Sequence, residues 1–231
     1  MLYRANRLSR AHNLLRKAAY VLLWRLPDWL KYGVGGVWRH FRQPYKLLGH
    51  GDAAVQVGAP WDTLRAGRSR AAHFARFVGN DGRVVVVEPS NSNVQALNGF
   101  AKRHAMSQIT VVPTGAWDKK ARLRFLINPD HPASNLVEEV VVDGRDRTGF
   151  EATDIEVDTL DNIVADSGIK NIKLLSITTN GSEMQVLRGA VETLSIVEYV
   201  SIITPDAGDF LSSHGFGPFG EDDRGYLFRK Q

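Results

Sequence analysis

Apolar runs alternate with helix-like patterns along most of the chain, from Asp52 onward. Four consecutive valines at residues 84–87 indicate a strand that is buried on both faces. The pattern predicts strands over 53–57, 83–88, 109–112, 172–177 and 198–203, and helices over 63–78, 91–104, 159–167 and 183–194. Because this alternation is typical of βαβ units, we expect an α/β fold with a mainly parallel sheet.

Two later stretches break the alternation. Residues 121–157 show period-two segments, including 140–142, interrupted by Pro129, Pro132, Gly144 and Gly149, which predicts an antiparallel insertion that determines specificity. Residues 215–230 predict a closing antiparallel hairpin. The acidic residues 221–223 are expected in a solvated loop.

The first residues predict an amphipathic helix. Its apolar stripe consists of Leu8, Ala11, Leu15, Ala18, Leu22 and Leu26. The longest apolar run, residues 18–24, has seven residues, whereas a membrane-spanning helix needs roughly 20. Pro27 and the cluster of Gly33, Gly35 and Gly36 are expected to end the helix and form a linker. We therefore predict an arm over residues 1–50 and a domain over 51–231.

Charge is concentrated in that arm. Residues 1–50 contain ten Lys and Arg against one acid, Asp28, a net +9, while the other 181 residues contain 19 bases and 24 acids. The acidic domain gives no electrostatic reason to expect nucleic acid. Tryptophans among the bases favour peripheral binding of the arm to an anionic membrane surface. A partner protein and an organelle-targeting peptide are the alternatives.

Other aspects of composition limit the chemistry. The chain has no cysteine, which fits a reducing, cytoplasmic compartment. Its seven histidines show no metal-ligand spacing, so no metal site is expected.

Six short segments occur in a fixed order: 55–59 (VQVGA), 85–89 (VVVEP), 159–163 (TLDNI), 173–177 (KLLSI), 180–183 (NGSE) and 186–190 (VLRGA). In this order they resemble the FkbM-type methyltransferases, over about residues 52–230. The resemblance implies a Rossmann-like sheet of seven strands that binds S-adenosylmethionine across the carboxyl ends of its first strands.

The resemblance also assigns cofactor-binding residues. Gly58 and Ala59 follow the first strand, where backbone has to approach the ligand closely. Glu88 ends the second strand, where a carboxylate accepts hydrogen bonds from the ribose hydroxyls. Trp117 and Asp118 lie in the segment that is expected to hold the adenine.

Several positions depart from the family pattern. Gln56 replaces an acid and Asp62 replaces a glycine in the first motif, which should weaken cofactor binding. In the catalytic motif, Thr178 and Asn180 replace acids, and Glu183 is retained, although an acid in a first helical turn also has a structural explanation.

Thr178 and Asn180 cannot act as general bases near pH 7, but they can position a hydroxyl group. Two functions follow. One is methyl transfer to a hydroxyl of a small-molecule, sugar or lipid-linked acceptor; the other is an inactive, methyltransferase-like subunit of a larger assembly.

Overall fold

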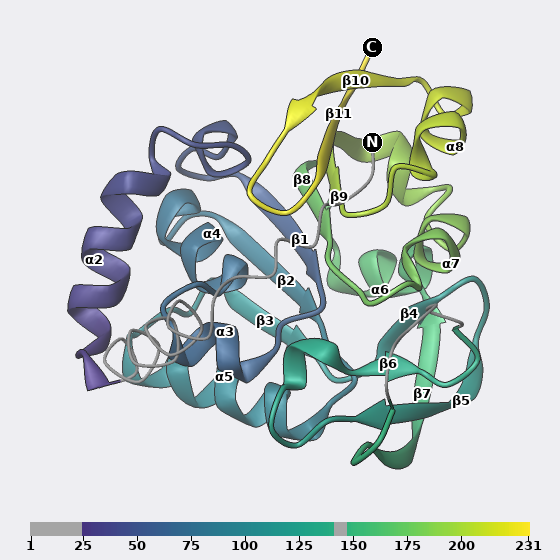
Figure 1. The fold of residues 1–231 in the computed structure, drawn as a ribbon. Helices are drawn as coiled ribbons and strands as arrows, with labels where there is room; N and C mark the ends of the chain where they lie inside the picture. The colour runs from purple at the N-terminus through teal and green to yellow at the C-terminus, as the bar shows by residue number, and fades with distance from the viewer. Residues whose placement is uncertain (1–24, 141–146) are drawn as a thin grey trace, which may run out of the picture.

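The computed structural model describes residues 25–140 and 147–231, and its main sheet has the strand order β10-β11-β9-β8-β1-β2-β3. These strands are β1 Ala53–Val57, β2 Arg83–Val87, β3 Ile109–Val112, β8 Ile172–Ile177, β9 Val197–Ile202, β10 Phe216–Glu221 and β11 Tyr226–Lys230. The strands from β3 to β9 are parallel, whereas β11 and β10 form an antiparallel hairpin (Figure 1). The predicted seven-stranded, mostly parallel sheet is confirmed.

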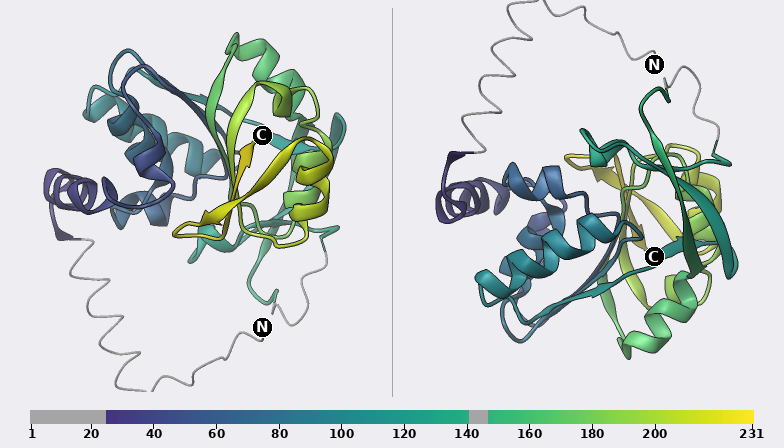
Figure 2. Two further views of the ribbon diagram at one scale, coloured as in Figure 1. Left: turned by 90° about the horizontal axis from the view of Figure 1, so that it is seen from above. Right: turned by 90° about the horizontal axis from the view of Figure 1, so that it is seen from below.

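Helices cover both faces of this sheet (Figure 2). On one side lie α2 Asp28–Arg39, η1 Tyr45–Leu47, α3 Trp61–Arg65, α4 Arg70–Val78 and α5 Asn91–Arg103. On the other lie α6 Leu160–Ser167, α7 Glu183–Arg188, η3 Thr193–Ile196 and α8 Ala207–Ser213. The valines of β2 explain why both faces are covered: Val84 and Val86 join one buried apolar cluster, and Val85 and Val87 join the other.

A second, smaller sheet lies beyond the carboxyl ends of the parallel strands. Its strands are β4 Gly115–Trp117, β5 Ala121–Ile127, β6 Leu136–Val137 and β7 Glu151–Thr159, in the order β4-β7-β5-β6, with η2 Pro132–Ser134 before β6. The antiparallel pairing of β5 with β6 and β7 agrees with the predicted insertion. The segment expected at 140–142 is not a strand at Val140, and its other two residues lie outside the described residues.

Tertiary contacts change two predicted helices, and a further helix was missed. The helix expected over 63–78 is two helices, because the chain turns at Gly67 (φ 69°) and Ser69 caps α4. The helix expected over 183–194 stops at Arg188, since Gly189 packs against the Trp117 carbonyl so closely that a Cβ would lie 2.0 Å from its oxygen. Helix α8 was not predicted.

The predicted linker at Pro27 and the following glycines is wrong. Helix α2 begins directly after Pro27 and runs through Gly33, Gly35 and Gly36. The reason is packing: the Tyr32 side chain is buried and donates to the Leu64 carbonyl at 2.7 Å, which outweighs the cost of about 1 kcal/mol for each helical glycine. The apolar stripe predicted at Leu8–Leu22 lies outside the described residues, and the division at residue 50 stays a prediction.

A buried arginine joins the segments near the carboxyl ends of β8 and β9. The Arg70 guanidinium, at the start of α4, donates to the hydroxyls of Ser176 and Ser201 at 2.9 and 2.7 Å. It also pairs with Asp222 and Asp223 in the β10–β11 turn. The turn is thereby fixed to α4. The solvated loop expected over 221–223 is therefore wrong for the buried Asp222 side chain, whereas Glu221 and Asp223 are exposed.

The guanidinium of Arg70 stabilises the negative charges of both aspartates in this cluster. Burial by itself raises the pKa of Asp223, but the charge of Arg70 and hydrogen bonds from Arg70 and Tyr45 outweigh it and hold the pKa below its usual range. The Asp222 side chain is fully buried (0% exposed), so it depends on Arg70 for compensation.

We expect Arg70→Met to lower the free energy of unfolding by about 3–5 kcal/mol, because it leaves the buried carboxylate of Asp222 without its positively charged partner. Urea denaturation measures the loss. Arg122→Met is the control: its side chain is 68% exposed and its shortest ion pair is 3.3 Å, so it should cost less than about 1 kcal/mol. Similar losses in both variants would contradict this account of the cluster.

Candidate functional site

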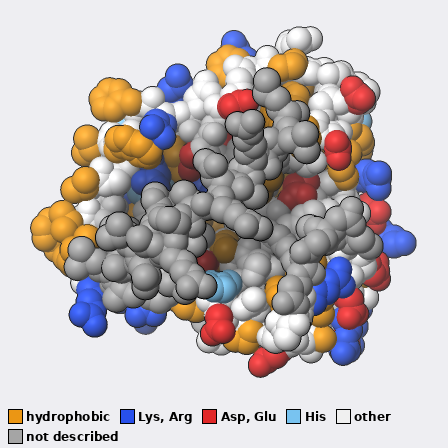
Figure 3. All heavy atoms as spheres, viewed as in Figure 1, with side chains coloured by type: hydrophobic (Ala, Val, Ile, Leu, Met, Phe, Trp, Pro, Cys, Tyr) orange, Lys and Arg blue, Asp and Glu red, His pale blue; other side chains and the backbone are white. Residues whose placement is uncertain are grey.

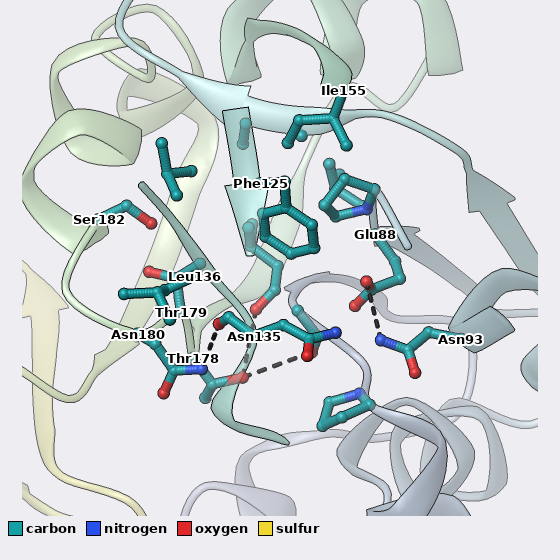
Figure 4. A pocket seen from close by; sticks show the side chains of 18 of the residues that line it. Glu88, Asn93, Phe125, Asn135, Leu136, Ile155, Thr178, Thr179, Asn180 and Ser182 are labelled. Carbon is teal, nitrogen blue, oxygen red and sulfur yellow. Dashed lines mark hydrogen bonds between the residues drawn. The ribbon is translucent and has the colours of Figure 1, made fainter. Parts of the chain in front are cut away.

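A cavity of about 80 Å³ lies between the two sheets, at the carboxyl ends of β1, β2 and β8 (Figure 4). In parallel α/β sheets this edge is where ligands bind. The main sheet contributes Gly58, Glu88 and the residues 178–180, and the second sheet contributes apolar side chains, among them Phe125, Leu136 and Ile155. The insertion predicted to affect specificity therefore forms one wall of the cavity.

Glu88 is the buried acid of this cavity, 4% exposed. One carboxylate oxygen accepts from the Ala59 N–H at 2.7 Å, and the other accepts from the Ser90 N–H and the Asn93 amide, both at 3.0 Å. Burial raises the pKa of Glu88 despite these hydrogen bonds. A carboxylate has about four lone-pair sites, so three hydrogen bonds leave one for a ligand.

The turn after β1 requires glycine at position 58. Gly58 has φ 85°, and a Cβ there would lie 2.7 Å from the Thr178 carbonyl oxygen. The ends of β1 and β8 can approach each other only without that Cβ. A close approach to the ligand was predicted at Gly58. In the structure, glycine is needed there because the backbone after β1 lies close to the backbone after β8.

Gln56, which replaces the family acid, clamps the same turn. Its amide nitrogen donates to the carbonyls of Val57 and Gly58 at 3.0 and 2.8 Å and to the Thr178 hydroxyl at 2.7 Å. A carboxylate has no proton to donate to these oxygens. The substitution is therefore matched to the conformation of the turn.

Asn180 fastens the second sheet to the first. Its amide donates to the carbonyls of Ala133 and Asn135 at 2.8 and 2.7 Å, which holds residues 132–137 across the cavity (Figure 4). Thr178 lies beside the cavity at the end of β8, with its hydroxyl 3.2 Å from the Val57 carbonyl. The buried amide nitrogen of Asn135 and hydroxyl of Thr179 line the cavity and have no hydrogen-bond partner.

A second cavity of about 70 Å³ adjoins the first, and the two share Gly58, Pro60, Ala133, Thr178 and Asn180. Its remaining wall is mixed, and its polar side chains include Gln56, Arg70 and Arg224. Gln56 Oε1 and Arg70 Nε are buried without a partner. Burial and the neighbouring charge of Arg70 lower the pKa of Arg224. Such groups suit a polar or anionic ligand.

Four of the residues singled out in the sequence line neither cavity. Asp62 lies in the first turn of α3 and accepts from the Thr63 N–H. Glu183 lies in the first turn of α7, 5% exposed, and accepts from the Gly181 N–H at 3.3 Å. Trp117 packs in the apolar cluster of the second sheet, and one oxygen of Asp118 is buried without a partner. Their functional roles stay predictions.

Sequence reasoning missed Asn93 and Asn135, whose neighbours come from distant segments. The side-chain amide oxygen of Asn93 (Oδ1) accepts from the backbone N–H of Trp61 at 3.0 Å. This hydrogen bond and the one from the Ala59 N–H to Glu88 occupy two backbone N–H donors in the turn after β1. Among the residues that the structure describes, no group of three or more histidines or carboxylates could hold a metal ion.

This chain is similar to a known family and to solved structures. The model of the methyltransferase FkbM domain matches residues 56–216. A methyltransferase FkbM from Methylobacillus flagellatus KT is similar in structure, with 18% identity and a TM-score of 0.50 over 95% of this chain and 60% of that one. The chain thus spans about 60% of that protein's length.

Two other solved structures are less similar. A putative rRNA-methylase from Clostridium thermocellum has 10% identity and a TM-score of 0.43, over 85% of this chain and 91% of its own. A SAM dependent methyltransferase from Aquifex aeolicus has 11% identity and a TM-score of 0.41, over 88% and 96%. The curated proteins give no match.

Gly58→Ala should destabilise the protein more than Gly168→Ala. Both glycines have positive φ, 85° and 70°, which costs alanine about 1–2 kcal/mol. Gly168 has nothing within 4 Å of the added Cβ, whereas Gly58 meets the Thr178 carbonyl, which adds about 1–3 kcal/mol. Equal losses in urea denaturation would show that the strand contact is not tight.

Proposed function

The chain belongs to the FkbM methyltransferase family, and on this premise we propose that it transfers the methyl group of S-adenosylmethionine to a hydroxyl of a small-molecule, sugar or lipid-linked acceptor. One observation carries the proposal. Glu88 is a buried carboxylate that directly follows β2 and lines a cavity at the carboxyl edge of the sheet. Packing alone does not require an acid there.

The residues present fit the cofactor at its ribose. Glu88 would accept from a ribose hydroxyl, and the apolar wall of Phe125, Leu136 and Ile155 would exclude water. When bound, the cofactor supplies a methyl group on a positively charged sulfur. The cavity of about 80 Å³ is smaller than typical small-molecule sites of roughly 300 Å³ and more, so residues 132–137 have to move to admit the cofactor.

The second cavity is suited to the acceptor. Thr178 and Asn180 belong to both cavities and would orient the hydroxyl between them. Neither has a proton to lose near pH 7, so these residues contribute position rather than base catalysis. Arg224 and Arg70 favour an acceptor with an anionic or strongly polar group on this side.

A second candidate function is a subunit without catalysis. It is favoured by the hydrogen bonds that already occupy the Ala59 and Trp61 N–H groups after β1. Neutral residues at 56, 178 and 180 agree with it. Cofactor binding distinguishes this candidate from the enzyme.

Isothermal titration should detect submillimolar binding of S-adenosylmethionine and S-adenosylhomocysteine. Glu88→Gln should weaken both by about tenfold, because a hydrogen bond to a charged acceptor contributes about 1.5 kcal/mol or more. Glu156→Gln is the control, since the Glu156 side chain is exposed and lines neither cavity. No binding to the folded wild-type chain would favour the noncatalytic subunit.

Asn180→Ala should bind S-adenosylhomocysteine more tightly, by up to about tenfold, while methyl transfer becomes slower. The variant lacks the two hydrogen bonds that hold residues 132–137 across the cavity, so closure competes less with binding. Titration measures the affinity, and transfer of a labelled methyl group measures the rate. Weaker binding by this variant would contradict the proposed opening.

A further inference from the structure

Helix α2 turns its charged residues toward the domain. The Lys31 side chain is 4% exposed, and its ammonium contacts the Arg65 carbonyl at 2.8 Å and Asp28 at 2.7 Å. Arg39, 9% exposed, donates to the Gly35 carbonyl at 3.1 Å and lies 5.4 Å from the Tyr45 ring centre. A surface helix normally has the opposite polarity, with charged residues facing water.

Large apolar side chains point away from the domain instead. We call the outer α2 face the set formed by Trp29 (71% exposed), Val34 (64%), Val37 (69%), Trp38 (53%) and Phe41 (76%). These are five of the nine large hydrophobic residues that are exposed in the described parts of the chain. In Figure 3 hydrophobic side chains gather along the edge of the molecule that α2 forms. Such a concentration marks an interaction surface.

Basic residues surround this face. Arg42 places its guanidinium 3.5 Å from the centre of the Trp38 ring, and Arg25 and Lys46 are exposed nearby in the sequence. Asp28 is the sole acid in residues 1–50, and its carboxylate is bound to Lys31 and His104. Tryptophan with arginine and lysine is the composition that settles in lipid headgroups and attracts anionic lipid.

We propose that the outer α2 face binds the surface of an anionic lipid bilayer, with α2 lying in the plane of the membrane. Helix α2 has 12 residues, and among the described residues no helix is long and apolar enough to cross a membrane. The excess of basic charge over the first 50 residues favours anionic lipid over a neutral surface. The proposal does not depend on methyl transfer.

Flotation of the full chain tests it, with vesicles of phosphatidylcholine and phosphatidylglycerol against vesicles of phosphatidylcholine alone. The chain should float with the anionic vesicles, and high salt should release part of it. Phe41→Ser should lower the bound fraction by about tenfold, since burial of one aromatic side chain contributes at least that factor. Phe219→Ser, at a ring 39% exposed on β10, should bind as the wild type does.

Three results would overturn the proposal. The first is failure of the full chain to float with anionic vesicles. The second is equal flotation of Phe41→Ser and the wild type, which would assign membrane binding to another segment. The third is a dimer in solution that Phe41→Ser converts to a monomer without changing flotation, because the face would then bind a second copy.

Discussion

The buried guanidinium of Arg70 is the interaction on which the carboxyl edge of the sheet depends. It bonds to β8 through Ser176, to β9 through Ser201, and to the β10–β11 turn through Asp222. Because a buried charge is costly without partners, these segments have to stay together. The same pairing carries Arg224, two residues farther along, to the wall of the second cavity. The charge that stabilises the fold thus also builds the candidate acceptor site.

The polar groups proposed to bind ligands form hydrogen bonds within the candidate site itself. Glu88 bonds to the Ala59 N–H, and Asn180 bonds to residues 133 and 135. A ligand that needs these groups has to replace those hydrogen bonds, so its apparent affinity reflects the difference between open and closed forms. On the proposed function, the presence of Thr178 and Asn180 in place of the family's acids would affect both the chemistry and the equilibrium between these forms.

The sequence predicted strands better than helices for a physical reason. Strands β1 and β8 have the predicted bounds, because central strands are buried on both faces and read as apolar runs. The edge strand β3 also has its predicted bounds. Helix α2 was missed because Tyr32 packs against residues far along the chain, which a local glycine pattern does not show. Gly58 and Glu88 were placed at the cavity by their position after strands. The burial of Asp222 depends on Arg70, 152 residues away, and no local pattern reveals it.

Helix α4 connects the two surfaces that the proposals concern. Its first residue, Arg70, lines the second cavity, and one turn later His73 packs against Tyr32 of α2, with ring centres 4.9 Å apart and ring planes tilted by 44°. Burial lowers the pKa of His73 to about 4. Its Nδ1 has no hydrogen-bond partner, so no group would accept a hydrogen bond from this nitrogen if it were protonated. His73 is therefore neutral in the folded protein above pH 6.5. As the pH falls from 6.5 toward 4, the unfolded chain binds the proton more readily than the folded chain, so the folded state loses stability. Helix α4 thus contacts α2 at His73 and lines the second cavity at Arg70. A membrane that binds the outer α2 face would therefore present a lipid-linked acceptor to that cavity in a fixed orientation.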